Sequence, residues 1–386
     1  MQDESTDAIS DRAKRWASTM HGHQDGASVR HAHADAAPAV ATGPVHPVDR
    51  ERRETAEDAL LASGATRAVG SGRRAVDEEP DPFRTCFERD RDRILHSAAF
   101  RRLAGKTQVF VFPHDHQRTR LTHALEVAQV AVGVAQACGL NAALTEAIAL
   151  GHDCGHGPGG HASEDALTQY VPGGYDHAVW GADVVLTPLN LCVETLDGVR
   201  NHSWSRPAPS TPEGEVVSWA DRVAYVCHDF EDAVSAGIVT PQHLPPVVLE
   251  RCGDRRSQQL RAFIDALVDT ILATGRVGMG DDGAEALAAF RACNYERIYL
   301  RPASVEQGRI VIAVLQALVE HFADRPNLLP EVAAGGGGLE AGSTDALRAA
   351  VTYVGGMTDR FAFENAIALL GWDRSALPVG VDVRPR

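Results

Sequence analysis

The sequence predicts an all-α protein: a helical bundle with additional C-terminal helices and at most a small hairpin. Apolar residues recur at helical spacing through most of the chain beyond residue 82. Runs of β-branched and aromatic residues are few, and one of them is the short segment 108–112. Hydrophobic residues make up 44% of the composition, an ordinary value for a globular protein, so the helices can bury a core.

The first 81 residues show little sign of regular structure. Residues 1–50 are rich in Ala, His, Asp, Gly and Pro and lack apolar periodicity, which is typical of a disordered tail. The segment 51–62 has the composition of a short helix, and Gly and charged residues return after it. We therefore divide the chain into a mostly disordered tail at 1–81, a helical core at 82–240, and a helical C-terminal part at 241–386 packed on the core.

Composition and charge exclude several classes of protein. The formal net charge of −15 argues against binding nucleic acid or membranes through a global basic field. A local basic cluster could still receive an anionic substrate: Arg101, Arg102, Lys106, Arg118 and Arg120. The sequence has no run of 18 apolar residues, so no membrane-spanning helix is expected, and its N-terminus lacks the apolar region of a secretory signal. The seven cysteines include no C-x-x-C pair, so we expect reduced thiols in a cytoplasmic protein.

The predicted helices begin with 86–103, where apolar residues recur at helical spacing. The segment 108–112 follows as an edge strand or hairpin. The next helix, 120–138, has a broad apolar face and ends before Gly139, a residue type that commonly terminates helices. Asn141 can cap the helix after it, and that helix leads into a histidine-rich stretch.

The histidine-rich stretch comprises residues 147–165. It places five polar side chains within 13 residues, separated by Gly and Pro: His152, Asp153, His156, His161 and Glu164. A helix cannot run through the Gly/Pro cluster, so His152 and Asp153 should lie at a helix end, and a new helix should start near His161. His161 and Glu164 are then i,i+3 neighbours on one helical face.

Adjacent His152 and Asp153 favour a metal site over a solvated loop, because they follow an apolar helix and would fill a core poorly. Two helices joined by a short turn run antiparallel, which brings His123, near the start of the first helix, beside this pair. Asp221 is a further candidate ligand, in a predicted helix at 214–236. Two imidazoles and two carboxylates suit a divalent ion such as Mg, Mn, Fe, Co or Zn.

Helical patterns continue to the end of the chain. Tyr225 and Asp229 follow Asp221 at i+4 and i+8, so the three side chains share one face of their helix. Beyond residue 240 the apolar spacing predicts four further helical segments, at 256–274, 283–293, 304–324 and 344–371.

The order His123, then His152 and Asp153, then Asp221 resembles the HD-domain metal phosphohydrolases. The resemblance is closest to the deoxyguanosine triphosphate triphosphohydrolases (dGTPases) and dGTPase-like proteins, and it covers roughly residues 82–372. Six segments carry it in the family's order: 89–103, 106–110, 118–123, 147–165, 219–225 and 356–361. It implies that the core is an HD-domain helical bundle.

The resemblance implies roles for the residues that match the family's pattern. The metal ligands would be His123, His152, Asp153 and Asp221. The catalytic residues would be His161 and Glu164, together with His156 near the α-phosphate. Arg120 would bind phosphate from the helical turn before His123. Contacts to the sugar and to further phosphate oxygens would come from Gln108, Tyr225, Asp229, Arg291 and Tyr299.

The implied reaction is hydrolysis of a deoxynucleoside triphosphate (dNTP), with dGTP the favoured one, to a deoxynucleoside and tripolyphosphate. The ion would polarise a phosphoryl oxygen and lower the pKa of a water. The resemblance also implies a homo-oligomer, often a hexamer in the family, and single-stranded DNA is another candidate partner. Two alternatives stay open: an HD phosphohydrolase acting on a nucleoside monophosphate or an alarmone, and a regulator that binds nucleotide or single-stranded DNA without catalysis.

The chain departs from the family's pattern at three places. Gly159 stands where the histidine loop often has Phe, and Thr352 stands where an aspartate is usual. A common Asn-x-Gln-x-x-Arg motif is absent after His177, where the chain has Ala178, Trp180 and Asp183. These departures leave every predicted metal ligand in place and bear on nucleobase preference and subunit contacts.

Overall fold

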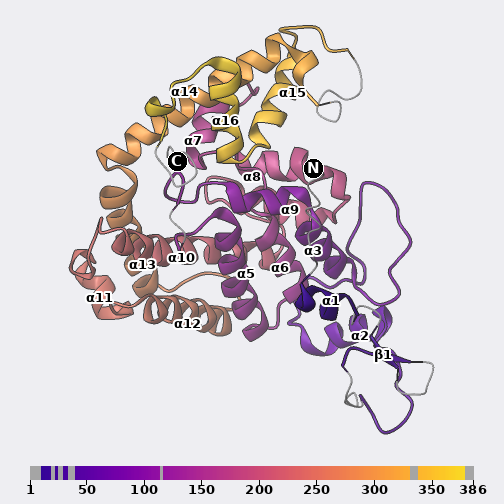
Figure 1. The fold of residues 1–386 in the computed structure, drawn as a ribbon. Coiled ribbons are helices and arrows are strands. Elements are labelled where there is room, and N and C mark those ends of the chain that lie inside the picture. Colours follow the sequence, from indigo (N-terminus) through magenta and orange to yellow (C-terminus); the bar gives the residue numbers. More distant parts are fainter. Residues whose placement is uncertain are drawn as a thin grey trace. The chain divides into compact units, whose positions relative to one another are not determined.

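The computed structural model describes residues 10–18, 22–24, 29–33, 40–113, 116–330 and 338–378. Helices dominate these residues (Figure 1), which confirms the predicted all-α class. Two compact units form, Met1–Val48 and Asp49–Arg386. The first contains α1 (Asp11–Ser18) and a small antiparallel hairpin of β1 (His23–Gln24) and β2 (Arg30–His31).

The second unit begins with α2 (Arg50–Leu60), close to the short helix expected at 51–62. The Asp49 side chain caps this helix by accepting a hydrogen bond from the Arg52 amide at 2.9 Å. Ala65 and Ala68, which follow, are buried in the main hydrophobic core. Residues 49–81, placed in the tail by the sequence, therefore belong to the helical body, while the division between 82–240 and 241–386 stays a prediction.

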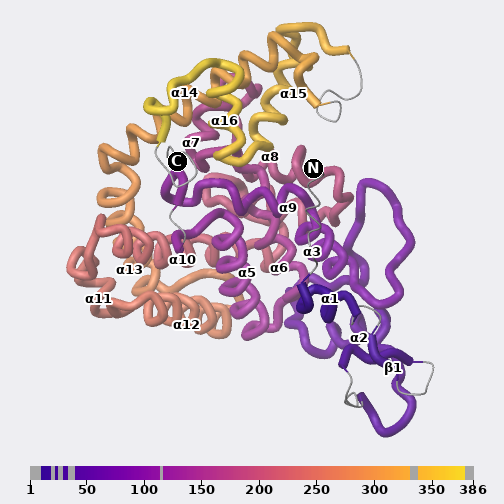
Figure 2. Tube along the Cα trace, in the orientation of Figure 1, coloured from indigo at the N-terminus to yellow at the C-terminus, as the bar shows by residue number. Residues whose placement is uncertain are grey.

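The main core extends to buried side chains between residues 248 and 298, and five of its helices are α3 (Cys86–His96), α5 (Arg120–Ala137), α6 (Ala142–Gly151), α9 (Val193–Asn201) and α10 (Pro212–Ser235). The trace in Figure 2 shows α5 and α6 side by side. Gly139 adopts a φ of 67° in the turn between them, a conformation that glycine adopts without strain. The Asn141 side chain then caps α6 by accepting from the Leu144 amide at 3.2 Å, as predicted.

A second core lies between α7 (His161–Thr168), α14 (Pro302–Asp324), α15 (Thr344–Gly355) and α16 (Asp359–Leu370). The predicted helical segment 344–371 is thus two helices. The helix is interrupted at residues 356–358, because the Thr358 hydroxyl caps a new helix by accepting a hydrogen bond from the Phe361 amide. Since α7 carries His161 and Glu164, this second core fixes one side of the candidate site.

Smaller elements complete the unit. Short helices are α4 (Ala98–Arg102), α8 (His177–Trp180) and α11 (Pro246–Cys252), and longer ones are α12 (Arg256–Thr274) and α13 (Asp281–Asn294). The 3₁₀ turns are η1 (Leu103–Gly105), η3 (Thr187–Leu189), η4 (Pro241–His243), η6 (Pro326–Leu328) and η7 (Arg374–Ala376), and the π turns are η2 (Gly181–Val185) and η5 (Tyr295–Tyr299).

The segment 108–112 forms bends where the sequence predicted an edge strand or hairpin. The nearby pairing, within the part of the chain that the structure describes, is one isolated bridge between Thr107 and Thr119. A side chain from α16 holds the start of this segment instead: the Asp359 carboxylate accepts a hydrogen bond from the amide of Thr107, the residue before the segment, at 2.9 Å. None of the described helices is long and apolar enough to cross a bilayer.

Candidate metal centre and active site

Three helices bring the four predicted metal ligands together. His123 lies in the first turn of α5, His152 and Asp153 follow the end of α6, and Asp221 lies within α10. The His123 Nε2 atom is 3.0 Å from Asp221 Oδ1 and 3.9 Å from Asp153 Oδ2. The His152 Nε2 atom is 3.5 Å from Asp153 Oδ1 and 3.7 Å from Asp221 Oδ1. All except Asp221 are buried.

The spacing of these atoms fits a divalent ion. An ion about 2.1 Å from its ligands separates neighbouring ligand atoms by about 3.0 Å in an octahedron and about 3.4 Å in a tetrahedron. The His152 ring is also prepared for binding: its Nδ1 lies 2.6 Å from the Ala149 carbonyl oxygen, so Nδ1 carries the proton. Its buried Nε2 has no hydrogen-bond partner among the described residues. The cluster can therefore hold a metal ion.

Arg120 places a buried positive charge beside these ligands. Its Nη1 donates to Asp153 Oδ2 at 2.7 Å, and both side chains are almost fully buried. Burial raises the pKa of Asp153, but the charge of Arg120 and the neighbouring His152 outweigh burial and hold that pKa well below its usual range. Asp153 is therefore a carboxylate at neutral pH, the form that binds a cation.

The predicted basic cluster is not one open patch. Arg118 is buried and pairs with three carboxylates, those of Glu126, Asp229 and Asp232. Lys106 is also buried, and its ammonium donates to the carbonyl oxygens of His156 and Gly355. Burial and the nearby Arg102 lower the pKa of Lys106 to about 7. Of this set, Arg120 is the residue that contacts the four predicted metal ligands, which we call the metal cluster, through Asp153.

Glu164 joins two histidines beside the cluster. Its Oε2 atom is 3.0 Å from His161 Nδ1, and its Oε1 atom is 2.8 Å from His177 Nδ1. Burial raises the pKa of Glu164, but the hydrogen bonds from the two imidazoles outweigh burial and lower that pKa far below its usual range. The His161 side chain is 76% exposed, so its Nε2 side faces solvent. This arrangement places an exposed imidazole, a type of group that can accept and donate a proton, beside the buried pair of Glu164 and His177.

His156 lies between the metal cluster and the Glu164 pair. Its Nε2 is 3.2 Å from Asp153 Oδ1, and its ring stacks on the His177 ring at a centroid distance of 3.7 Å. Burial and the positive charge of Arg120 lower the pKa of His156 well below its usual range, so the ring is neutral. The structure thus brings His156, His161 and Glu164 together, as expected from the sequence.

Two further histidines were not recognised as site residues from the sequence. His202 follows the end of α9, and its Nδ1 is 2.8 Å from the Val199 carbonyl oxygen. Its Nε2 lies 3.2 Å from His177 Nε2. Burial and the neighbouring His152 and His177 lower the pKa of His202 to about 4. His202 ends a helix as His152 does, and that position is the signal that could have identified it.

Four of the residues expected to contact the sugar or the phosphates form a second group: Tyr225 and Asp229 on α10, Arg291 on α13 and Tyr299 in η5. Arg291 Nε donates to the Tyr225 hydroxyl at 2.8 Å, and the Tyr299 hydroxyl donates to Asp229 Oδ2. Asp229 also accepts from Arg118, so its carboxylate is already paired. Gln108 has a buried Oε1 without a hydrogen-bond partner within the described ranges. Tyr225 lies one turn from Asp221, so this group adjoins the metal cluster.

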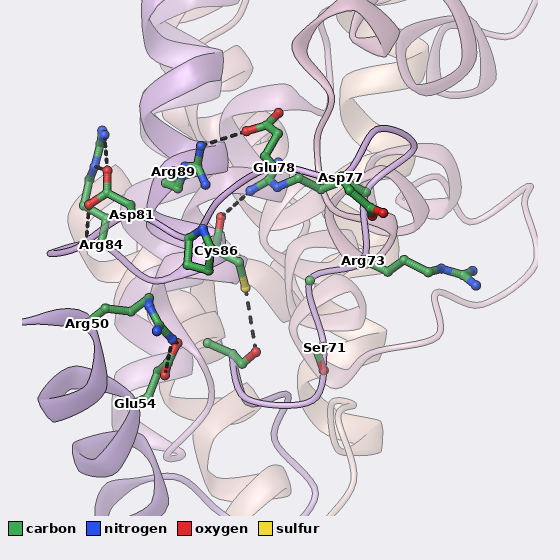
Figure 3. A pocket seen from close by; sticks show the side chains of 14 residues that line it. Arg50, Glu54, Ser71, Arg73, Asp77, Glu78, Asp81, Arg84, Cys86 and Arg89 are labelled. Atoms are coloured by element: carbon green, nitrogen blue, oxygen red, sulfur yellow. Dashed lines mark hydrogen bonds and ion pairs between the residues drawn. The ribbon is translucent and has the colours of Figure 1, made fainter.

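A separate surface cavity of about 340 Å³ lies near α2 and the start of α3 (Figure 3). Arginines and acidic residues line it, and several are paired: Arg50 with Glu54, Arg84 with Asp81, and Arg89 with Glu78. Within the part of the chain that the structure describes, its lining includes none of the predicted site residues. Its charges are largely neutralised by one another.

Comparison with known proteins agrees with this geometry. The HD domain model matches residues 120–226, and the phosphohydrolase-associated domain model matches residues 277–366. The first of these spans the helices that carry His123, His152, Asp153 and Asp221, together with the loop and helix of His156, His161 and Glu164.

Several relatives are named deoxyguanosinetriphosphate triphosphohydrolase-like proteins. One from Caldanaerobacter subterraneus subsp. tengcongensis is 39% identical over 320 residues, which is 81% of this chain and 93% of the relative. One from Clostridium perfringens is 38% identical over 331 residues, covering 81% and 94%. One from Syntrophus aciditrophicus is 35% identical over 382 residues, covering 82% and 95%.

Solved structures overlap less closely. A hypothetical protein from Aquifex aeolicus is 17% identical, with a TM-score of 0.45 and coverage of 72% of this chain and 68% of that one. A phosphohydrolase from Bacteroides thetaiotaomicron is 18% identical, with a TM-score of 0.44 and coverage of 74% and 70%. The sequence relatives and the domain matches carry the assignment: the chain belongs to the deoxyguanosinetriphosphate triphosphohydrolase-like family of HD-domain phosphohydrolases.

Proposed function

We propose that this phosphohydrolase is a metal-dependent dNTP triphosphohydrolase, with dGTP as its favoured substrate and a deoxynucleoside and tripolyphosphate as its products. The observation that carries the proposal is the convergence of two groups at one place. His123, His152, Asp153 and Asp221 form the metal cluster, and His161 with Glu164 lies beside it at an open edge. The names of the relatives, deoxyguanosinetriphosphate triphosphohydrolase-like proteins, support the choice of substrate.

The proposed ligands of the ion are His123, His152, Asp153 and Asp221. When bound, a divalent ion at this cluster supplies polarisation of a phosphoryl oxygen and lowers the pKa of a bound water. Imidazole and carboxylate ligands together suit Mn, Fe, Co or Zn, and a site that keeps waters also suits Mg. The chain's own contribution is to hold these donors dry and in a fixed geometry, since three of the four are buried.

Arg120 and His161 are the proposed charge and proton groups. Arg120 uses one terminal nitrogen on Asp153, and its remaining donors can neutralise a phosphate oxygen beside the cluster. His161 is held by Glu164 through Nδ1, which leaves Nε2 facing outward to exchange a proton with water or with the 5′-oxygen of the leaving deoxynucleoside. Neutral His156 stacks on His177 and meets the His161 ring edge to face, so it helps to position this edge of the site.

The deoxyribose is proposed to lie against Tyr225. An aromatic ring packed on C2′ disfavours a 2′-hydroxyl, and Asp229 can accept from a 3′-hydroxyl through an oxygen it now shares with Tyr299 or Arg118. Arg291 is held next to Tyr225 and offers a cation for the outer phosphates. Gln108, with its buried and unpartnered carbonyl oxygen among the described residues, is the remaining proposed sugar contact.

The test is a product assay with each dNTP and each ribonucleoside triphosphate, in Mg²⁺ or Mn²⁺, resolved by ion-exchange chromatography. The proposal expects a deoxynucleoside and tripolyphosphate, with dGTP turned over fastest and ribonucleotides poorly. An Asp153→Ala variant should lose the activity, and His96→Gln, which changes an exposed histidine on α3, should keep it. Turnover of nucleoside monophosphates or alarmones without dNTP turnover would contradict the proposal and would instead indicate an HD phosphohydrolase that acts on those nucleotides.

We also propose that the chain forms a homo-oligomer, as the family resemblance implies. Light scattering coupled to size-exclusion chromatography gives the number of chains directly, and the resemblance favours six. Adding dNTP or single-stranded DNA during the same measurement shows whether either partner shifts the assembly. A single chain under every condition would contradict the proposal.

A further inference from the structure

The segment 154–160, which we call the 154–160 loop, has few side chains of its own that could fix its shape. It joins Asp153, a proposed metal ligand, to His161, the proposed proton carrier. Five of its seven residues are glycine or proline, which supply no polar side chain. The position of His161 therefore depends largely on contacts that reach this loop from other segments.

Asp359, in the first turn of α16, binds the loop and a second segment at once. Its Oδ1 atom accepts a hydrogen bond from the Gly159 amide at 2.8 Å. Its Oδ2 atom accepts from the Thr107 amide at 2.9 Å and also from the Thr107 hydroxyl. The Asp359 side chain is buried, so loss of this acceptor would leave buried amides without a partner, which is costly.

Thr107 connects Asp359 to the helix that carries His123. It forms an isolated β-bridge with Thr119, the residue that precedes α5. Through Thr107, Asp359 therefore fixes the 154–160 loop relative to the helix end that supplies the first proposed metal ligand.

Lys106 holds the same loop from the residue before Thr107. Its buried ammonium donates to the carbonyl oxygen of His156 and, at 3.0 Å, to that of Gly355 at the end of α15. Its own carbonyl oxygen accepts from the Arg120 amide at 3.3 Å. The loop backbone thus receives a donor from Lys106 in addition to the acceptor that α16 supplies.

Helix α14 packs against the loop at a position without a side chain. Gly159 has a φ of 74°, and a Cβ atom there would overlap the Val311 side chain of α14. Val311 is fully buried in the second core, together with side chains of α15 and α16. Figure 1 shows α14 alongside both α7 and α16. Helices α14 and α16 therefore both contact the loop at Gly159.

We propose that Asp359 and Lys106 are positioning residues for proton transfer at His161. They hold the loop that leads into His161 at a fixed place relative to the metal cluster, and they act through the loop backbone. The inference rests on the proposed function, because it assigns both residues to the same reaction. It also gives α15 and α16 a role in that reaction, although they carry none of the proposed metal-binding, catalytic or substrate-binding residues.

Removal of the Asp359 charge should reduce kcat more than it changes KM. A displacement of a catalytic group by about 1 Å can lower the rate by about 10²-fold. In Asp359→Asn, the amide nitrogen cannot accept a hydrogen bond, so either the Gly159 amide or the Thr107 amide loses its partner. The proposed metal ligands lie in α5, in α10 and directly after α6, so Mn²⁺ affinity should stay near the wild-type value.

Glu213 provides a matched control, because it has the same three types of partner as Asp359. It is fully buried in α10. Its Oε1 atom accepts from the amides of Thr66 and Asn141, each at 3.0 Å, and its Oε2 atom accepts from the Thr66 hydroxyl at 2.8 Å. Asn141 precedes α6, whereas the metal cluster lies at the other end of that helix, about 15 Å away along its axis. Glu213→Gln therefore disturbs the same kind of buried network far from the 154–160 loop.

The experiment compares kcat and KM for dGTP, Mn²⁺ affinity and Tm among the wild type, Asp359→Asn and Glu213→Gln. Both variants should have a lower Tm. Asp359→Asn should also lower kcat by about 10–10²-fold with little change in KM or Mn²⁺ affinity, and Glu213→Gln should keep the wild-type kcat. An unchanged kcat in Asp359→Asn, or an equal fall of kcat in both variants, would overturn the inference.

Two further variants carry the test if Asp359→Asn does not fold. Thr107→Val removes the hydroxyl but keeps the hydrogen bond from the backbone amide to Asp359. Lys106→Met removes the donor to the His156 carbonyl oxygen. Each should lower kcat with little change in KM, and Thr107→Val should do so by the smaller factor. A wild-type kcat in both variants would overturn the inference.

A readout without turnover separates the failure of this inference from the failure of the proposed function. NMR of histidine-labelled, chelator-treated protein should show shifted imidazole signals of His156 and His161 in Asp359→Asn and wild-type signals in Glu213→Gln. Those shifts in a chain that hydrolyses no dNTP would uphold the positioning of the loop and refute the proposed function. Turnover of dNTP with unshifted signals in both variants would give the reverse outcome.

Discussion

At the scale of single residues, Glu164 is the carboxylate that connects two histidines of the site. It is a partly buried carboxylate whose two oxygens hold two imidazoles with opposite surroundings, since His161 is exposed and His177 is buried. Burial lowers the pKa of His177, but the hydrogen bond and charge of Glu164 outweigh burial and raise that pKa above its usual range. Glu164 therefore sets where the proton resides in the metal-free protein.

The Glu164→Gln variant tests this electrostatic role. Without the charge, burial acts on His177 unopposed, so its pKa should fall from above to below about 6.5, the ordinary value. NMR titration of histidine-labelled, chelator-treated protein measures the change. The sign for stability follows: the wild-type pair stabilises the fold below about pH 6.5 and loses this contribution as pH rises through the raised pKa of His177. The variant should lack this additional stability at acidic pH. An unchanged pKa of His177 in the variant would contradict this account.

The exposed His161 gives the corresponding prediction for catalysis. His161→Gln removes the proposed proton carrier but leaves the four proposed metal ligands in place, so kcat should fall by about 10²–10⁴-fold while KM changes little. Steady-state kinetics on dGTP measure both constants, and His96→Gln serves as a control on an exposed histidine of α3. A larger effect on KM than on kcat would assign His161 to substrate binding alone.

At the scale of secondary-structure elements, the site is built from helix ends. His152 caps the C-terminus of α6 and His202 caps that of α9, and each ring donates to the carbonyl oxygen three residues earlier. The C-terminal end of a helix leaves carbonyl groups unpaired, so these bonds satisfy the backbone and orient the ring together. Asp176 similarly starts α8 by accepting from the Ala178 amide at 2.9 Å, which fixes His177.

The loop between α6 and α7 depends on the absence of a side chain at Gly155. A Cβ atom there would lie 2.5 Å from the Gly181 amide nitrogen and still closer to the His177 carbonyl oxygen. Gly155→Ala should therefore displace α8 and lower the free energy of unfolding by about 3 kcal/mol or more. Displacement of His177 should accompany this loss, and thermal unfolding followed by metal titration measures both.

Gly133→Ala is the matched control for that substitution. Gly133 lies within α5, and a Cβ atom there would have no described heavy atom within 4 Å beyond those of its own helix and chain neighbours. Alanine favours a helix over glycine by about 0.5–1 kcal/mol, so this variant should be slightly more stable than the wild type. Equal destabilisation of both variants would show that the contact of Gly155 with α8 is not the cause.

Predictability differed between elements for physical reasons. Helices with strong apolar periodicity and clear caps were predictable, as the bounds 256–274 show, and so was the meeting of His123 with His152 across the turn between α5 and α6. His177 and His202 were not, because α8 and α9 are short and their approach depends on packing between segments distant in sequence. The bends at 108–112 likewise reflect tertiary contacts, since Asp359 anchors Thr107.

At the scale of the whole molecule, a bound ion should stabilise the fold. Carboxylates and imidazoles from α5, from the end of α6 and from α10 converge on one cluster, so an ion that binds them links these helices only in the folded state. At a free concentration 100 times the dissociation constant, such an ion stabilises by about 2.7 kcal/mol. Adding Mn²⁺ to chelator-treated protein should thus raise Tm by about 4 °C.

Asp153→Ala provides the comparison for this measurement. Its Tm should not respond to Mn²⁺, because the carboxylate nearest to both His152 and Arg120 is gone. Differential scanning calorimetry of the wild type and the variant, each in chelator and in Mn²⁺, gives the four Tm values. An equal rise in wild type and variant would mean that the ion acts at another place.

The central claim is that the clustered histidines and carboxylates direct water to the α-phosphorus of a dNTP. The most direct measurement is mass spectrometry of the products of dGTP hydrolysis in H₂¹⁸O. The account predicts unlabelled deoxyguanosine and tripolyphosphate that carries one ¹⁸O atom, because water attacks phosphorus and the 5′-oxygen leaves with the nucleoside. Labelled deoxyguanosine, or deoxyguanosine monophosphate with pyrophosphate, would contradict it.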